Sequence, residues 1–498
     1  MKRFMKRALF VLMCVTLLPL TASADAVEID GLYYNLVNKS KTAEVTRNPA
    51  TDILSGSYSG DIIIPSKVTY ESVEYNVTAI GENAFKNCFH LSSISIPNSV
   101  TSIGYRAFDS CNKLTSLILP NSVTTIGSDA FFCCTSMTSI ILSDNLTSIG
   151  GDAFGYCTAL KSITIPDGIT KINNSTFTNC SNLNSVIIPN GVTIIDYNSF
   201  QNCTGLISIN IPNSVTNIAI NAFNNCSNLT TVIIGSGIQD IYNNSFANCA
   251  ELTDVYCFAE SVSSTGADTF NGSGVNYANL HVPASSVSSY SASAPWSGFG
   301  TIDAITSEDI TIGDLGIGTF CGSNPLDLSG TEDVKAYAVS SYESATGQVT
   351  LTRTYYIPPF TGVVVKGNKG VYTIPAGVGQ PVYPNMMKGV TTNTVLDKVN
   401  GDYTNYVLAN KGGNLGFYAV SDGSTLGAGK AYLPLPTADL PTAAREFTLI
   451  FDDGETTEIM KVASQEKASQ GYYDLQGRRV ANPTSGLYIV NGKKVIIK

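Results

Sequence analysis

The pentapeptide AFKNC occupies residues 84–88 and returns in altered form as AFDSC at 107–111 and AFGYC at 153–157. Each Cys of this kind follows the previous one by 23 residues, and a Phe always stands three residues before it. The cysteine column consists of Cys88, Cys111, Cys134, Cys157, Cys180, Cys203, Cys226 and Cys249. A fixed period of this length predicts a solenoid, in which each repeat forms one coil and buries its apolar face against its neighbours.

Further apolar columns keep the same register along the repeats. They begin at Leu91, Ile94 and Ile96, and another column is Ile throughout, from Ile103 to Ile241. The segment LSSISIP alternates apolar and polar residues, which predicts a short strand with Ile94 and Ile96 pointing inward. Stacked coils would align these strands in a parallel sheet, and eight coils would give a strand face about 35–40 Å long.

The outward positions of these strands are the candidate ligand-binding residues. They form a hydroxyl stripe and, beside it, a mixed stripe with apolar members that we expect to be exposed: Ile118, Ile141, Ile187 and Ile233. Hydroxyl and β-branched residues favour strand surfaces in any protein, but an exposed, nearly uncharged apolar patch also marks an interaction site. The candidates are Ser93, Ser95, Ser116, Ile118, Ser139, Ile141, Ser162, Thr164, Ser185, Ile187, Ser208, Asn210, Thr231 and Ile233.

The cysteine column is expected to consist of small buried residues with free thiols. A rung spacing near 5 Å would permit disulfides between coils, but equivalent side chains in a ladder point the same way rather than toward one another. Metal binding needs ligands that converge from several directions, and the adjacent pair Cys133 and Cys134 has no histidine nearby in the sequence.

The pattern Leu-x-x-Ile-x-Ile-Pro, followed by Val, Ile-Gly, Ala-Phe and Cys at a period of 23, covers about residues 80–270. It resembles the BspA-like leucine-rich repeats of bacterial surface proteins. The resemblance implies a right-handed solenoid with parallel strands. It also implies attachment to host extracellular proteins such as fibronectin and fibrinogen, or co-aggregation with other bacteria.

The regions around the array have other patterns. Residues 25–79 are expected to form an N-terminal cap, and residues 80–303 the solenoid with its C-terminal cap, where Trp296 would cover the last coil. Residues 304–452 contain short segments rich in Val, Tyr and Ile between Gly, Asn and Pro turns. Such segments predict a sandwich-like all-β domain, and they resemble parts of multidomain proteins from Bacteroidota.

The N-terminus has the features of a secretory signal peptide over residues 1–24. Basic residues precede an apolar run from Ala8 to Leu20, and a small-residue triplet ends at Ala24, after which we expect cleavage. A lipoprotein anchored through Cys14 is the alternative, but the bulky Met13 stands where lipoprotein processing needs a small side chain.

The C-terminal segment, residues 453–498, has a different resemblance. The sequence YDLQGR at 473–478, the strand-like GLYIV at 486–490 and a basic ending resemble the sorting tails of type IX secretion substrates. This resemblance implies passage across an outer membrane and attachment to the cell surface. The alternative is that a terminal hairpin completes the preceding β domain.

Charge and composition exclude several functions. Without residues 1–24 the chain has 25 Lys and Arg against 39 Asp and Glu, a net charge of −14, which disfavours nucleic acid. No apolar run after the signal reaches the length of a membrane span. The two histidines, His90 and His281, lie far apart, and no nucleophile or phosphate-loop motif has a credible context, so we expect no enzyme and no cofactor or metal.

The sequence therefore predicts a monomeric adhesin that is secreted or held on the outer-membrane surface. It would bind host matrix or plasma proteins, or other bacteria, through the strand face. A structural spacer without a ligand is the alternative. Glycan capture is less favoured, because the stripe contains no aromatic residues of the kind that stack on sugars.

Overall fold

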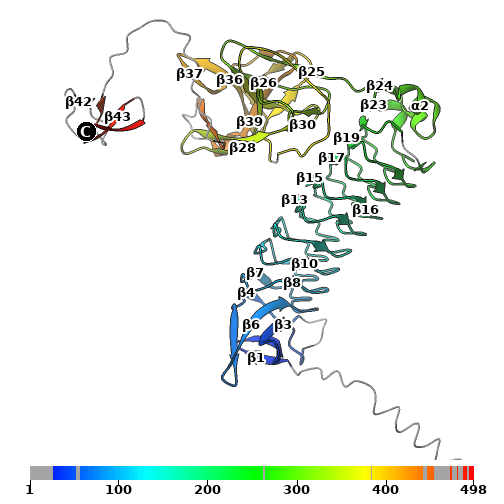
Figure 1. The fold of residues 1–498 in the computed structure, drawn as a ribbon, viewed down its shortest axis with the longest axis vertical. Coiled ribbons are helices and arrows are strands. Elements are labelled where there is room, and N and C mark those ends of the chain that lie inside the picture. Colours follow the sequence, from blue (N-terminus) through cyan, green and yellow to red (C-terminus); the bar gives the residue numbers. More distant parts are fainter. Residues whose placement is uncertain are drawn as a thin grey trace, which may run out of the picture.

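The computed structural model describes a chain that is almost entirely β structure, in agreement with the expected fold class (Figure 1). A long solenoid of parallel strands is followed by an antiparallel β domain and a small C-terminal sheet. The residues described are 26–51, 56–261, 264–382, 384–440, 446–453 and the backbone of four strands between 472 and 497. The expected signal peptide, with Cys14, and residues 474–478 of the YDLQGR element lie outside them. In the part of the chain that is described, no helix is long and apolar enough to cross a membrane.

The N-terminal cap covers the first coil on two sides. Its antiparallel strands lead into β6, which pairs in parallel with β8 of the first coil, while β4 pairs in parallel with β7. Both open strand edges at this end are therefore satisfied. The cap strands are β1 (Val27–Ile29), β2 (Leu32–Val37), β3 (Thr42–Thr46), β4 (Gly60–Ile63), β5 (Lys67–Tyr70) and β6 (Val73–Ile80).

One ladder of the solenoid is formed by the predicted strands. The ladder contains β7 (Leu91–Ser95), β9 (Ser116–Ile118), β11 (Ser139–Ile141), β13 (Ser162–Thr164), β15 (Ser185–Ile187), β17 (Ser208–Ile211), β19 (Thr231–Ile234), β21 (Asp254–Cys257), β23 (Asn279–Val282) and β24 (Thr301–Ala304). Equivalent strands pair in parallel in successive groups, which are β4 with β7, β9 with β11, β13 with β15, and the series from β17 to β24. Ser116 therefore lies beside Ser139 and Ile118 beside Ile141.

A second parallel ladder was not predicted. Its strands have two residues each, and their inward members form the all-Ile column from Ile103 to Ile241, which the sequence showed only as a further apolar column. It contains β8 (Ser102–Ile103), β10 (Thr125–Ile126), β12 (Ser148–Ile149), β14 (Lys171–Ile172), β16 (Ile194–Ile195), β18 (Asn217–Ile218), β20 (Asp240–Ile241) and β22 (Ser264–Thr265). The period of the Ile column was the signal for this ladder, but two residues are too few to show alternation.

A stack of phenylalanine rings runs through the core. From Phe85 to Phe270, neighbouring ring centroids lie between 5.1 and 5.8 Å apart, and the ring planes are nearly parallel. Tyr58 covers the N-terminal end of the stack at 5.0 Å. At the other end Trp296, which is buried, meets Phe270 edge-on at 5.2 Å, so the expected aromatic plug is confirmed.

The cysteines form a second stack beside the rings, and the prediction of free thiols is confirmed for every described Cys. From Cys111 onward, each ladder thiol donates a hydrogen bond to the carbonyl oxygen of the Phe in the preceding coil. The Sγ–O distances lie between 3.1 and 3.4 Å. Burial raises the pKa of Cys180 to about 12, so this thiol remains protonated at neutral pH.

Each coil turns through residues with positive φ, and one of them directly precedes the ladder Cys. A side chain that tolerates the left-handed region is needed there, which explains the frequent Asn at this position. The amides continue from coil to coil, since Asn202 donates to Asn179 at 2.9 Å and Asn225 donates to Asn202 at 2.8 Å. The residues are Asn87, Ser110, Cys133, Tyr156, Asn179, Asn202, Asn225 and Asn248.

The C-terminal cap contains the helical segments of the solenoid. They are η1 (Val275–Tyr277), α2 (Val287–Ala292) and η2 (Trp296–Gly298), followed by the last ladder strand β24. The indole nitrogen of Trp296 donates to the Thr265 hydroxyl at 3.1 Å, and the Tyr290 hydroxyl donates to the Ala259 carbonyl at 3.0 Å. These bonds fix the cap on the last coil.

The β domain has antiparallel pairing throughout its main sheet except between β29 and β40, which are parallel. Two separate hydrophobic clusters, around Phe417 and around Ile357, form its core. Its elements are β25 (Glu308–Ile312), β26 (Ile317–Phe320), β27 (Leu326–Asp327), β28 (Val334–Glu343), β29 (Gln348–Thr354), β30 (Tyr356–Ile357), β31 (Val363–Gly367), β32 (Gly370–Ile374), β33 (Lys388–Val390), β34 (Thr394–Leu396), β35 (Val399–Asn400), β36 (Tyr403–Lys411), β37 (Asn414–Ala419), β38 (Ser424–Leu426), β39 (Lys430–Pro436), η3 (Thr437–Asp439) and β40 (Glu446–Phe451).

The last four strands form a sheet of their own. They pair only with one another among the described strands, so this sheet does not extend the main sheet of the β domain. The predicted strand pair is present, with Gly486 opposite Ile497 and Val490 opposite Lys493. The strands are β41 (Tyr472–Tyr473), β42 (Arg479–Val480), β43 (Gly486–Val490) and β44 (Lys493–Ile497).

Candidate functional site

The candidate site is the outer surface of the first ladder, which we call the strand face. Each short strand places one inward residue, such as Leu117 or Ile140, between two outward residues. The parallel register then aligns equivalent outward residues in two columns along the solenoid. Neither column has a charged residue from Ser93 to Asn210, so contacts with this part of the face depend on apolar area and neutral hydrogen bonds.

The predicted residues lie on this face, but their exposure falls along it. The exposed ones are Ser93, Ser95, Ser116, Ile118, Ser139, Ile141, Ser162 and Thr164. Those of intermediate exposure are Ser185, Ile187, Ser208 and Asn210. Thr231 and Ile233 are buried, so the expectation that Ile233 is exposed is wrong: its side chain is only 2% exposed.

The uncovered end of the face begins earlier than the sequence indicated. Ile63 of β4 lies beside Ser95 in the parallel register and is 77% exposed. Ile118 and Ile141, on the two coils that follow Ser95, are 68% and 59% exposed. The Ser93 hydroxyl donates to the Asp61 carboxylate at 2.7 Å, which places one charge at this end. The IIIP segment at residues 62–65 was the available signal, but the absence of the Phe and Cys columns had assigned it to the cap.

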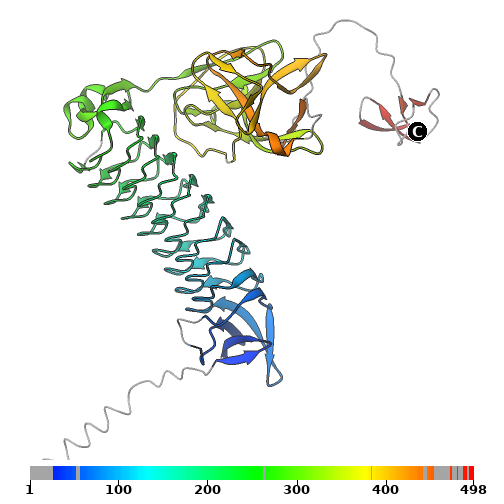
Figure 2. The same cartoon turned by 180° about the vertical axis from the view of Figure 1, so that it is seen from behind.

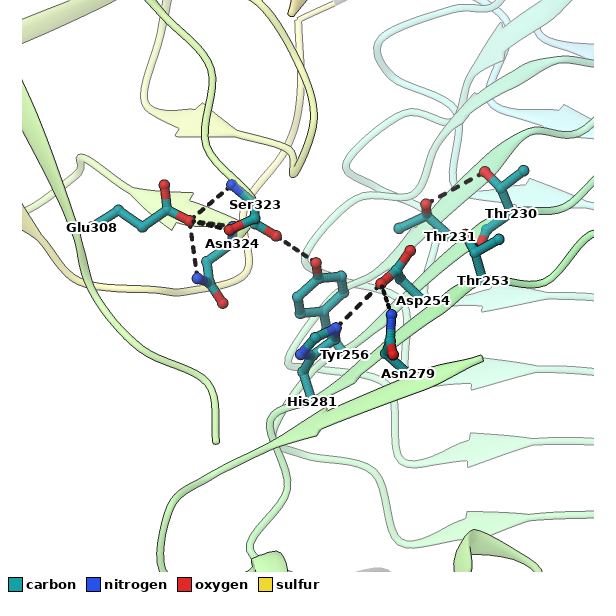
Figure 3. A network of polar contacts seen from close by, with 10 residues as sticks. All are labelled: Thr230, Thr231, Thr253, Asp254, Tyr256, Asn279, His281, Glu308, Ser323 and Asn324. Atoms are coloured by element: carbon teal, nitrogen blue, oxygen red, sulfur yellow. Dashed lines mark hydrogen bonds and ion pairs between the residues drawn. The ribbon is translucent and has the colours of Figure 1, made fainter. Parts of the chain in front are cut away.

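The β domain covers the other end of the face, which explains the burial of Ile233. Figure 1 shows this domain on the side of the solenoid that carries β13 to β19. Ile233, Tyr256 and Tyr356 form a buried cluster that joins the two parts of the chain. The Asn210 amide donates to the Gly379 carbonyl. The Tyr256 hydroxyl donates to the Ser323 carbonyl (Figure 3).

The segment that accepts the Tyr256 hydrogen bond is itself held in place. One Glu308 carboxylate oxygen accepts from the backbone nitrogens of Ser323 and Asn324, at 2.8 and 2.5 Å, and from the Asn324 side chain at 2.9 Å. Figure 3 shows these groups gathered beside the Tyr256 hydroxyl. The covered end therefore meets a pre-ordered surface, which lowers the entropy cost of the contact.

On the solenoid side, Tyr256 is supported by a second set of contacts. The ring of His281 stacks on it, with centroids 4.4 Å apart, and His281 also lies 3.3 Å from the Asp254 carboxylate. Burial opposes ionisation of Asp254, but hydrogen bonds from His281 and Asn279 outweigh burial and hold its pKa below the usual value. Burial also raises the pKa of the Tyr256 hydroxyl, which therefore stays protonated and able to donate.

The contact between the two parts is not completely filled. A cavity of about 50 Å³ lies between the ladder, at Asn210 and Thr231, and the loop residues Pro358, Pro359 and Pro381. The Asn210 amide oxygen is buried there without a hydrogen-bond partner. A cavity of this size has room for water, which would satisfy that oxygen.

The outward side chains of the strand face from Ser93 to Asn210 are hydroxyl, amide and apolar groups. Among the described residues, no group of three or more His, Cys, Asp or Glu side chains is arranged to hold a metal ion. The ladder thiols are buried, and His281 is engaged with Tyr256 and Asp254. Exposed isoleucines among hydroxyl groups are suited to contact with a complementary protein surface.

Stacked coils of 23 residues, with a strand ladder on one side and buried Leu and Ile columns, define a leucine-rich-repeat solenoid. The family described as "BspA type Leucine rich repeat region (6 copies)" matches the chain twice, at residues 65–184 and 170–294. Residues 65–294 are therefore similar to leucine-rich repeat regions of the BspA type. A comparison with curated proteins gave no match.

Several solved structures are similar to the solenoid part of the chain. A leucine rich cell surface protein from Faecalibacterium prausnitzii is 24% identical, and the match covers 56% of this chain and 94% of that one, with a TM-score of 0.41. A leucine-rich repeat protein from Bacteroides ovatus is also 24% identical, with coverage of 56% and 76% and a TM-score of 0.42. Another from Bacteroides capillosus is 30% identical, with coverage of 32% and 96% and a TM-score of 0.21.

Proposed function

We propose that this chain is exported and acts on or outside the cell surface as an adhesin that binds other proteins through its strand face. The observation that carries the proposal is the pair Ile118 and Ile141, which lie side by side on adjacent coils and are both more than half exposed. Burying one such side chain at an interface contributes about 1.5–3 kcal/mol. The surrounding hydroxyls supply hydrogen bonds without the cost of burying charge.

The sequence features at the two ends support export. The signal-like segment at residues 1–24 directs the chain out of the cytoplasm, and the tail at residues 453–498 resembles sorting tails that lead to the cell surface. The partners are host matrix or plasma proteins, or surface proteins of other bacteria, as the resemblance to BspA-like proteins implies. The acidic net charge favours partners other than nucleic acid.

The test is binding of the mature chain, from residue 25 onward, to an array of host matrix, plasma and bacterial surface proteins. Ile141→Asp places a charge in the exposed pair, and binding should fall by at least about tenfold. Ile220→Asp is the matched control, since Ile220 is 49% exposed but lies in the turn after β18, away from the strand face. Circular dichroism checks that both variants fold.

Binding that both variants retain, or an array without any saturable partner, would overturn the proposal. In either case the solenoid would serve as a spacer that holds other material away from the cell. Loss of binding in Ile141→Asp alone would support the strand face as the binding surface.

A further inference from the structure

The covered end of the strand face is an interface that the chain already uses, and its outward residues belong to the same 23-residue column as those of the uncovered end. The outward column passes through Ile118 and Ile141, then Thr164 and Ile187, then Asn210 and Ile233, and each pair is aligned in the parallel register. Ile233 in turn aligns with Tyr256. The chemistry that covers one end of this column therefore indicates what the other end can accept.

The covering surface has three parts: the segment of Ser323 and Asn324, which the Glu308 carboxylate holds, and two loop-containing segments of the β domain without charged residues. One of these two is TYYIPPFTGVVV at residues 354–365, and the other is IPAGVGQPVYPNMM at 374–387. Tyr356 from the first loop packs against Ile233 and Tyr256, with Val378 from the second loop at the edge of the cluster. The cavity beside this cluster is lined by prolines from both loops: Pro358, Pro359 and Pro381.

At the covered end, the two hydrogen bonds between the solenoid and the β domain have the same direction. The solenoid supplies the donors, which are the Asn210 amide and the Tyr256 hydroxyl, and the β domain supplies backbone carbonyls at Gly379 and Ser323. Extended segments with proline leave many carbonyls free to accept, because proline has no N–H and the polyproline conformation has no internal hydrogen bonds. An irregular segment of this kind fits a surface of side-chain donors.

The uncovered end repeats the same combination of groups. Ile118 and Ile141 supply exposed apolar area, and the neighbouring Ser116, Ser139 and Ser162 supply exposed hydroxyl donors. Asp61, at the N-terminal end of the face, is its one charge there, so a charged segment would lose its hydration along Ile118 and Ile141 without gaining an opposite charge beside them. Uncharged segments are therefore favoured over charged ones.

We propose that the uncovered part of the strand face binds an extended, uncharged segment with proline and aromatic residues, supplied by another protein. This inference rests on the function proposed above and names the chemistry of the partner. From Ile63 to Ile187 the column spans five rungs of about 4.8 Å, or about 24 Å. At about 3.1 Å per residue, a segment of about eight residues would cover that length.

The test uses a fluorescent peptide with the sequence of residues 374–385, IPAGVGQPVYPN, as the probe for the mature full chain. Fluorescence anisotropy should show saturable binding that weakens by at least about tenfold in Ile141→Asp and stays unchanged in Ile220→Asp. A control peptide with each Val and Tyr replaced by Lys should not bind. Because Ile141 lies outside the contact with the β domain, its effect locates the peptide on the uncovered end.

Three results would overturn the inference: no saturable binding of the peptide, equal binding of the lysine control, or binding that Ile141→Asp leaves unchanged. A different result is possible with a protein partner from the array. If Ile141→Asp abolishes binding of that partner but the peptide does not displace it, the proposed function stands and the proposed kind of segment is rejected.

Sedimentation of the mature chain provides a further check. A dimer that Ile141→Asp dissociates would identify a second copy of this chain as the occupant and overturn the inference.

Discussion

The thiol of Cys111 donates a hydrogen bond to the carbonyl oxygen of Phe85 at 3.2 Å, across the boundary between two coils. Phe and Cys stand three residues apart in each repeat, yet the bond joins the Cys of one coil to the Phe of the coil before it. The recurring motif thus stacks a ring on a ring and also gives a second donor to a buried carbonyl that already accepts from the Cys88 backbone amide. Cysteine suits this position because it is small and apolar and still has a weak donor.

The ladder thiols should be unreactive in the native chain. Burial raises the pKa of Cys157 and its neighbours in the column well above the ordinary value, and only the thiolate attacks an alkylating reagent. Cys133 is half-buried and should be modified first. Mass spectrometry after brief iodoacetamide treatment of the mature chain at pH 8 would locate the label.

Denaturant provides the control, because unfolding should expose every cysteine to the reagent. Labelling of Cys157 in the native chain at the rate of Cys133 would contradict the buried hydrogen-bonded ladder.

Removing one ring from the stack should weaken the solenoid strongly. Phe177 lies 5.5 Å from Phe154 and 5.2 Å from Phe200 and is fully buried. Phe177→Ala should lower the free energy of unfolding by about 3–5 kcal/mol, because it removes buried area and leaves a cavity. Urea unfolding followed by circular dichroism measures this change.

A control substitution shows whether the loss of stability comes from the ring stack or from the removal of any Phe side chain. Phe89 is 40% exposed and outside the stack, so Phe89→Ala should cost much less. Equal midpoints for the two variants would count against a central role for the stacked rings.

A charge on the covered end of the strand face should separate the β domain from the solenoid. Ile233 is buried against Tyr356, and Ile233→Asp would place a carboxylate in that apolar contact. Because the side chain points away from the interior of the coil, the solenoid should remain folded. Small-angle scattering should then show a larger radius of gyration than in the wild-type chain.

Ile118→Asp makes the same change in the same column, at a position that is 68% exposed. It should leave the radius of gyration unchanged. If Ile233→Asp scattered like the wild type, the two parts would not depend on this contact for their arrangement.

Stability should depend on Asp254 at low pH. Its folded-state pKa is held below the value of an unfolded Asp, which is about 3.9. The folded state therefore favours the carboxylate, and this stabilisation is present above about pH 4 and is lost as the pH falls through the lower, folded-state pKa. The melting temperature of the wild type should fall more steeply below pH 4 than that of Asp254→Asn. Parallel curves for the two chains would contradict this assignment.

Much of the solenoid could be predicted from its columns. The inward positions of Ile94 and Ile96, the free thiols and the aromatic plug at Trp296 follow from a strict period and from alternation. The second ladder could not be assigned in the same way. A strand such as Thr125–Ile126 is too short to alternate, and its pairing depends on coils that are adjacent in space.

The sequence predicts which side chains of the ladder point outward better than it predicts where the exposed part of the strand face begins and ends. Period and alternation show that Ile233 points outward, but they do not show that Tyr356, far along the chain, covers it. The same is true at the other end, where Ile63 joins the face through pairing of the cap strand with β7. Both differences arise from contacts that the repeat itself does not encode.

The uniform joint between coils has a consequence for how such proteins change over generations. From Phe85 to Cys249, each coil meets the next through the same ring stack and the same thiol-to-carbonyl bond, so these joints do not depend on their place in the series. A gene that gains or loses a whole unit of 23 codons would still encode a closed rod with intact ends. The length of the solenoid can therefore change between generations in steps of one coil, while the two caps and the contacts between coils are preserved.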